Sequence, residues 1–162
     1  MNPAAAALGL RDFYHVGLVV HDLDEAIRRF EQDLGVGRWA SMVLEGQARF
    51  RGTIESDQHR VAFAPSGLGY IELVEPLMGR SAASEFLAQR GEGVYHIGFW
   101  VDDAGDAVRR AEGLGIGVAS LAEDDQGPTV VLLDAGATGG VHVELVTTRL
   151  RPLFEAWVAA AQ

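Results

Sequence analysis

The chain has 162 residues, enough for one compact domain, and its 48% hydrophobic and 22% charged residues are ordinary for a folded globular protein. Its formal net charge of −10 makes nucleic acids and anionic membrane surfaces unfavourable partners. The absence of cysteine excludes disulfides, thiolate nucleophiles and cysteine-ligated metals, and all 13 basic residues are arginines, which excludes lysine chemistry.

The first ten residues do not fit a secretory signal, because no basic residue precedes their apolar run. No stretch reaches the roughly 20 uninterrupted apolar residues that a membrane span needs. We therefore expect a flexible tail over residues 1–10 and a cytoplasmic protein.

The same strand-and-helix pattern occurs twice. The first copy reads YHVGLVVHDLDEA and the second reads YHIGFWVDDAGDA. In each copy an apolar strand leads to an aspartate, Asp22 or Asp103, that can cap a helix, and a second acidic residue follows three positions later. Both helices repeat apolar residues on one face and end at a glycine. The pattern predicts an internal duplication of structure.

Short extended segments follow each helix, because the apolar pattern changes to a period of two between turn-forming residues. The expected strands lie near 37–44, 47–54, 60–65 and 69–75 in the first half, and near 116–121, 128–133 and 141–147 in the second. Each half, 11–78 and 92–148, is then a strand, a helix and about three strands. Residues 79–91 are predicted to form a linking helix, and residues 149–162 a C-terminal helix.

Two histidines and two glutamates lie in otherwise apolar strands. His15 and His96 occupy the same place in the two copies, and Glu72 and Glu144 occupy the same place in the last strands, YIELVE and HVELVT. Carboxylates are rarely buried in such strands without a cation or an ion-pair partner. If the copies pack about a pseudo-twofold axis, the four side chains converge and can hold a divalent metal. The alternative is a pair of structural histidine–carboxylate hydrogen bonds.

These motifs resemble the vicinal oxygen chelate superfamily, which includes glyoxalase I, methylmalonyl-CoA epimerase, extradiol dioxygenases and bleomycin-resistance proteins. The resemblance covers residues 12–147 and is strongest to the methylmalonyl-CoA epimerase branch, through YHVGLVVHDLDEAI, IELVEPL, EFLAQRGEGVYHIGFWVDD and GGVHVELV. It implies an α+β fold in which two tandem βαβββ modules form one domain, with a curved eight-stranded mixed sheet around a central metal site. It also implies a homodimer and one divalent ion (Zn, Ni, Co, Mn or Fe) held by His15, Glu72, His96 and Glu144.

The resemblance implies a small-molecule substrate with a carbonyl or two neighbouring oxygens, which loses a proton while the metal stabilises the enolate. Val61 stands where several bacterial epimerases have a catalytic glutamate, so the expected base is Glu144 or Glu72. Strand alternation adds two catalytic candidates, Tyr70 on the face of Glu72 and His142 on the face of Glu144. Either of these two can instead be a wall residue.

The favoured function is a metal-dependent isomerase or epimerase, and the runner-up is a glyoxalase I-like lyase, which the glutamate in YIELVE favours. A non-haem Fe(II) oxygenase usually has fewer protein ligands, and a small-molecule binding or resistance protein generally lacks the ligand set. His21 and His59 are expected in solvent. Arg49, Arg51 and Arg60 either bind an anionic part of the substrate or lie on the surface.

Overall fold

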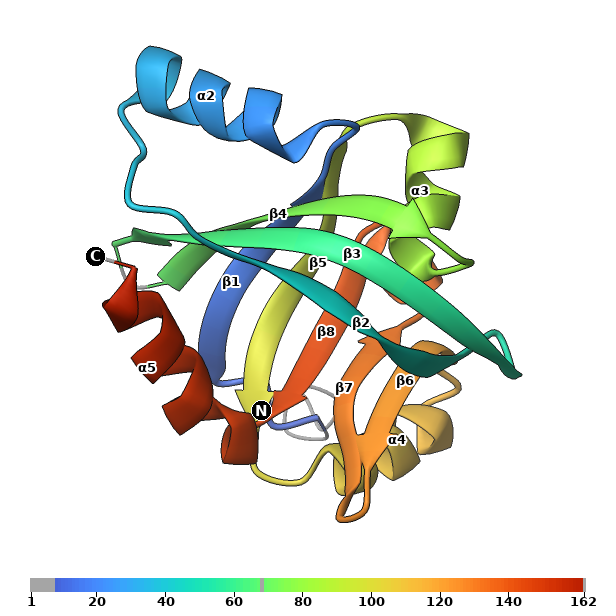
Figure 1. Ribbon diagram of the computed structural model, residues 1–162. Helices are drawn as coiled ribbons and strands as arrows, with labels where there is room; N and C mark the ends of the chain where they lie inside the picture. Colours follow the sequence, from blue (N-terminus) through green and yellow to red (C-terminus); the bar gives the residue numbers. More distant parts are fainter. Residues whose placement is uncertain (1–7, 68, 162) are drawn as a thin grey trace.

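The computed structural model describes residues 8–67 and 69–161. Most of the tail predicted for residues 1–10 lies outside the described residues. Over the described part, eight strands close into a barrel in the order β1-β4-β3-β2-β6-β7-β8-β5 (Figure 1). The predicted α+β fold with an eight-stranded mixed sheet is confirmed, and the sheet closes on itself.

Each half of the chain contributes four neighbouring strands to the barrel. The first half comprises β1 (Asp12–Val19), α2 (Leu23–Leu34), β2 (Ala40–Phe50), β3 (Thr53–Ser66) and β4 (Gly69–Met78). The second comprises β5 (Gly93–Val101), α4 (Ala104–Gly113), β6 (Val118–Asp124), β7 (Gly127–Leu133) and β8 (His142–Thr147). In each half the first strand pairs in parallel with the last, β1 with β4 and β5 with β8. The halves meet along the antiparallel pair β1/β5 and at a short β2/β6 pair, so they are arranged alike, as the sequence repeat predicts.

The helices begin where the sequence signals place them. Asp22 accepts a hydrogen bond of 2.9 Å from the backbone N–H of Glu25 at the start of α2, and Asp103 accepts one of 2.8 Å from Asp106 at the start of α4. The remaining elements are α3 (Ala82–Arg90) between the halves, α5 (Arg151–Ala160) at the C-terminus and 3-10 turns at Ala135–Thr138 and Thr148–Leu150. Within residues 8–67 and 69–161, no helix has the length and apolar character needed to cross a membrane.

The first half has three strands after its helix, where the sequence pattern predicts four. The separate strands predicted at 37–44 and 47–54 are wrong, because β2 runs unbroken through Gly46, which stays paired with β3. The chain reverses later, at Arg51 and Gly52, whose φ angles are 47° and 84°. Positive φ at both central residues is the geometry of a two-residue hairpin turn. In the sequence, Gly46 resembles a turn residue although it lies inside a long strand.

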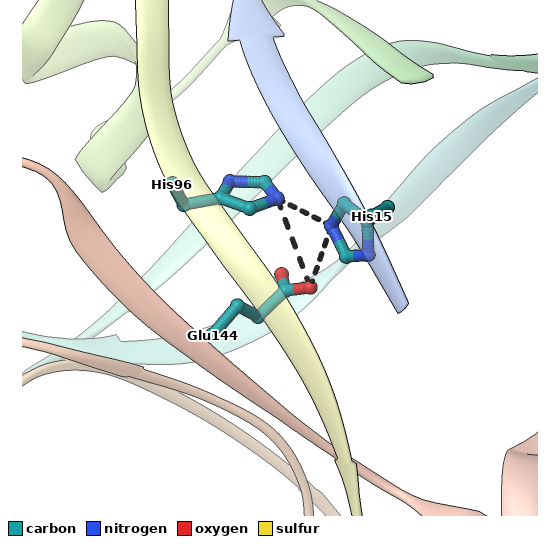
Figure 2. Close-up of side chains that lie close together, drawn as sticks. All are labelled: His15, His96 and Glu144. Atoms are coloured by element: carbon teal, nitrogen blue, oxygen red, sulfur yellow. Dashed lines mark hydrogen bonds and ion pairs between the residues drawn. The ribbon is translucent and has the colours of Figure 1, made fainter. Parts of the chain in front are cut away.

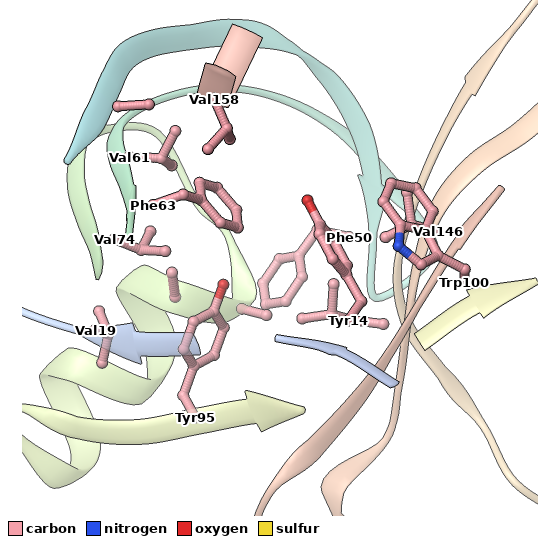
Figure 3. Packing of buried hydrophobic residues seen from close by; sticks show 14 residues of the cluster. Tyr14, Val19, Phe50, Val61, Phe63, Val74, Tyr95, Trp100, Val146 and Val158 are labelled. Atoms are coloured by element: carbon pink, nitrogen blue, oxygen red, sulfur yellow. The ribbon is translucent and has the colours of Figure 1, made fainter. Parts of the chain in front are cut away.

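The largest apolar core lies inside the barrel, and α5 packs against it (Figures 1 and 3). The ring of Phe154 on α5 lies edge-on to Tyr14 and Phe63, with centroid distances of 4.8 and 5.0 Å. Val158 on the same helix is buried. Fully burying one large apolar side chain contributes about 1.5–3 kcal/mol, so these contacts fix α5 as part of the interior wall.

Candidate metal centre

Four side chains from four strands converge inside the barrel: His15 of β1, Glu72 of β4, His96 of β5 and Glu144 of β8. The Nε2 atoms of the two imidazoles are 2.5 Å apart. Oε2 of Glu72 lies 3.1 Å from Nε2 of His15 and 2.9 Å from Nε2 of His96. Oε2 of Glu144 lies 3.1 and 3.8 Å from the same two nitrogens. Figure 2 shows both imidazoles and Glu144 turned toward one point, so the structure brings together all four expected ligands.

The pairing of the strands produces this convergence. Gly17 on β1 lies opposite His96 on β5, and on its other side Gly17 lies beside Glu72 on β4. The imidazole of His96 therefore lies over a glycine and reaches the glutamate of the strand beyond. The equivalent row, related by the internal repeat, consists of His15, Gly98 and Glu144.

The donor set and its spacing fit a divalent transition-metal ion. Two imidazole nitrogens and two carboxylate oxygens suit Zn and its neighbours in the series. Ligand atoms around a tetrahedral ion with bonds of about 2.0–2.1 Å lie about 3.3 Å apart, and the distances that involve an imidazole Nε2, 2.5 to 3.8 Å, bracket that value. Oε2 of Glu72 is buried and faces the Nε2 atoms of both imidazoles, an arrangement that suits a shared ion. The ligand atoms of His15, His96 and Glu144 lie within 4.8 Å of one another, so these three residues by themselves form a group that could hold an ion.

Burial and mutual contact shift the pKa values of the cluster in opposite directions. Burial by itself lowers the pKa of His15, but its contacts with Glu144 and Glu72 outweigh burial and raise that pKa to about 9. Burial by itself raises the pKa of Glu72, but the contacts with His15 and His96 outweigh it and lower that pKa to about 2. Burial and the two glutamate charges raise the pKa of the adjacent Tyr14 well above its usual range. Glu72 is therefore ionised, and Tyr14 is a neutral hydroxyl.

A cavity of about 480 Å³ reaches Glu72 and Glu144 along an otherwise apolar wall. Its wall comes from the barrel strands and from α5. We call it the apolar chamber; besides the two glutamates its lining residues are Tyr14, Met42, Leu44, Val61, Phe63, Trp100, Val130, Val146, Leu150, Leu153, Phe154 and Trp157.

A second cavity, of about 260 Å³, also reaches Glu72 and Glu144, and its wall is more polar. One lining residue is His59, whose Nε2 lies 3.1 Å from Oδ2 of Asp57 and whose side chain is 16% exposed. The expectation that His59 is solvated is wrong, because β3 is longer than predicted and turns His59 to the same face as Val61. The sequence signal was the two-residue spacing between His59 and Val61, which places both side chains on one face of a strand.

The other two catalytic candidates are not among the described residues that line these two cavities. Tyr70 is partly buried and packs its ring edge-on against Phe154 at 5.0 Å. His142 is buried, its Nδ1 lies 2.8 Å from the carbonyl oxygen of Leu133, and it lines a separate pocket. Both side chains therefore pack away from the described walls of the two cavities.

The three arginines considered as anion-binding residues are also outside the described walls of the two cavities. Arg51 pairs with Glu85 at 2.5 Å, and Arg60 pairs with Asp24 at 2.6 Å. No charged partner is recorded for Arg49 among the described residues. His21 is exposed, as expected.

One curated relative and several solved structures are similar to this chain. The protein YqjC of Bacillus subtilis (strain 168) is 33% identical over 85 residues, which are 52% of this chain and 54% of that protein. The match thus spans about half the length of this relative. A hypothetical protein of Bacillus halodurans C-125, BH1468, has a structure that aligns with a TM-score of 0.61 and 22% identity, over 85% of this chain and 94% of that chain.

Methylmalonyl-CoA epimerases have a similar structure. A variant of the Streptomyces coelicolor enzyme in complex with 2-nitronate-propionyl-CoA aligns with a TM-score of 0.64 and 26% identity, over 85% of this chain and 94% of that chain. The Mycobacterium tuberculosis enzyme aligns with a TM-score of 0.56 and 24% identity, over 84% of this chain and 87% of that chain. Residues 14–130 match a protein family described as the glyoxalase/bleomycin resistance protein/dioxygenase superfamily. Because this match spans most of the duplicated barrel, the chain belongs to that superfamily.

Proposed function

We propose that this protein is a metal-dependent isomerase or epimerase that removes a proton next to a carbonyl group. The observation that carries the proposal is the buried cluster of His15, Glu72, His96 and Glu144, which two cavities reach. Burying two carboxylates costs free energy that a bound cation offsets. A small molecule can reach a cation site that opens to two cavities, so this position suits substrate binding better than a purely structural role.

The chemistry follows from the two carboxylates. The four residues would hold the ion, and a divalent cation there would supply Lewis acidity toward a carbonyl oxygen of the substrate. Oε2 of Glu144 faces the imidazoles, which leaves Oε1 to accept the proton from the carbon beside the carbonyl. The electron pair of the broken C–H bond moves to the carbonyl oxygen and gives an enolate. A solvent proton delivered to the opposite face of that carbon completes an epimerisation, and Glu144 returns its proton to solvent.

The residue at position 61 supports a carboxylate as base. Val61 is 3% exposed and lines both cavities, but an isopropyl group cannot accept a proton. Among the four catalytic candidates, Glu144 and Glu72 line the cavities, whereas Tyr70 and His142 are not among the described residues that line them. We therefore assign proton transfer to the glutamates.

The ligand of one similar structure supports this reaction class. The Streptomyces coelicolor epimerase, at 26% identity, binds 2-nitronate-propionyl-CoA. A glutamate at position 72 favours a glyoxalase I-like lyase as the second candidate, because the resemblance places glutamine there in characterised epimerases. Both reactions begin with the same proton removal. A homodimer stays a prediction of the family resemblance, and a cytoplasmic location stays a prediction of the sequence.

Hydrogen exchange in D2O tests the proposal. Protein loaded with Zn, Co or Ni is incubated with methylmalonyl-CoA, with the uncharged ester methyl mandelate and with the hemithioacetal of methylglyoxal and glutathione, and NMR follows the hydrogen next to the carbonyl. We expect metal-dependent exchange with at least one compound and its loss in Glu144→Gln, which keeps a ligand oxygen but removes the base. Oxygen consumption with Fe(II) and no exchange would assign an oxygenase instead.

A further inference from the structure

We infer that the substrate is a compact molecule whose two metal-directed oxygens carry an uncharged, apolar or aromatic body. This inference rests on the proposed function and names the substrate class of the same site. It follows from the walls of the apolar chamber and from the charges around Glu72 and Glu144.

The apolar chamber has the size and surface of a small-molecule site. Its volume, about 480 Å³, lies within the range of roughly 300–1,000 Å³ that is typical of ligand pockets. The rings of Tyr14 and Trp100 lie 4.2 Å apart between centroids and form one side of the wall. Figure 3 shows these rings and that of Phe63 facing the same interior. Such a wall offers an aromatic or branched aliphatic group edge and face contacts and few hydrogen bonds.

The charges around the site disfavour an anionic body. Besides the two tyrosines Tyr14 and Tyr95, the charged or titratable groups among the described lining residues of the two cavities are Glu45, Asp57, His59, Glu72 and Glu144, and no arginine is among them. A carboxylate or phosphate on the substrate would therefore lie near carboxylates without a guanidinium to pair with it. The net charge of −10 adds to this repulsion. A bound cation can offset the charge of a chelating head group, but it lies at one end of the chamber only.

The C-terminal helix forms part of the wall of the apolar chamber. Phe154 and Trp157 of α5 line the chamber, and Phe154 also contacts Tyr14 and Phe63. Leu153 lines it too and is 72% exposed, which places it at the rim. The body of a bound substrate therefore contacts α5 while its oxygens face Glu72 and Glu144.

Three hydroxamates with the same chelating head test the inference. Acetohydroxamate, benzohydroxamate and 4-carboxybenzohydroxamate each present two oxygens to a metal, and they differ in the body: a methyl group, a phenyl ring and a charged phenyl ring. Their affinities for the Zn-loaded protein are measured by calorimetry. We expect benzohydroxamate to bind at least about tenfold tighter than acetohydroxamate, and the added carboxylate to remove that gain.

Variants of α5 connect the gain to the chamber. We expect Trp157→Ala and the milder Phe154→Leu to reduce the preference for benzohydroxamate by about tenfold and fivefold, respectively, with little change for acetohydroxamate. Phe30→Ala on α2, outside the chamber, is the matched control and keeps the preference.

The outcomes separate the inference from the proposed function. Equal affinities for benzohydroxamate and acetohydroxamate, or tighter binding of 4-carboxybenzohydroxamate, would overturn the inferred substrate class and leave the metal centre in place. Protein that takes up no Zn and binds none of the three compounds would overturn the proposed function as well.

Discussion

Gly17 and His96 lie opposite each other on β1 and β5, and a Cβ atom built on Gly17 would stand 2.2 Å from Cε1 of the His96 ring. Gly98 has the same relation to His15, again with a distance of 2.2 Å to Cε1. Real Cβ atoms essentially never come within 3.0 Å of such a neighbour. Each imidazole therefore occupies the space that a side chain would take on the adjacent strand, and each His-x-Gly segment belongs to the candidate metal centre.

The substitutions Gly17→Ala and Gly98→Ala should each displace one imidazole. We expect loss of metal binding and a fall of about 1–3 kcal/mol in the free energy of unfolding, because an added methyl group overpacks a buried site. Metal analysis and urea denaturation measure the two effects. Gly46→Ala is the matched control, since a Cβ there has no neighbour within 4 Å and the backbone is already extended. Wild-type metal affinity in both Gly17→Ala and Gly98→Ala would contradict this account.

The metal content of the protein tests the ligand set directly. Protein purified without a metal-affinity tag should carry about one equivalent of a divalent transition metal, as a single four-ligand site requires. His96→Ala and Glu144→Ala should lose it, whereas His21→Ala, which changes an exposed histidine, should keep it.

The same site should link metal binding to stability. An ion at 100 times its dissociation constant adds about 2.7 kcal/mol to the free energy of unfolding, so a chelator should lower the melting temperature of the wild type. The chelator should leave the melting temperature of Glu144→Ala unchanged. A wild type that neither contains nor takes up Zn, Co, Ni, Mn or Fe would leave a metal-free binding protein as the better account.

The duplicated barrel and the convergence of the four side chains could be predicted because the sequence contains the same motif twice. His15 and His96 stand in matching strands, and alternation with a period of two then places Glu72 and Glu144 on inward faces. Gly17 follows His15 by two residues, so the same alternation predicts that it faces the barrel interior. Its role is hidden in the sequence because a glycine has no side chain that marks it as part of a site.

The cavities could not be predicted, because they depend on which distant elements meet. Trp157 reads as an apolar position of an ordinary amphipathic helix, and only tertiary packing brings it to the same chamber as Glu144. The sequence predicts a solvent-exposed His59 because the polar residues around it resemble a loop. The extended hairpin of β2 and β3 overrides that local preference and turns His59 to the interior.

The hairpin turn between β2 and β3 should depend on Gly52. Its φ of 84° lies in the left-handed region, where a Cβ costs about 1–2 kcal/mol. We expect Gly52→Ala to lower the free energy of unfolding by about that amount, whereas Gly37→Ala, in a loop with ordinary φ and open space, should change it little. Urea denaturation of both variants measures the difference. Equal stability of the two variants would mean that the turn adopts another conformation.

His142 should support the fold and not carry the proton. It lies beside His96 in the β5/β8 register, yet its Nδ1 is 2.8 Å from the carbonyl oxygen of Leu133. An imidazole that donates Nδ1–H to this carbonyl stabilises the fold by about 1 kcal/mol, which His142→Ala should lose. Metal content and the rate of hydrogen exchange in D2O should stay at wild-type values, and Tyr70→Phe should behave in the same way. A tenfold slower exchange in His142→Ala, with the metal retained, would instead give His142 a direct part in proton transfer, since loss of a wall hydrogen bond alone changes stability and not the chemical step.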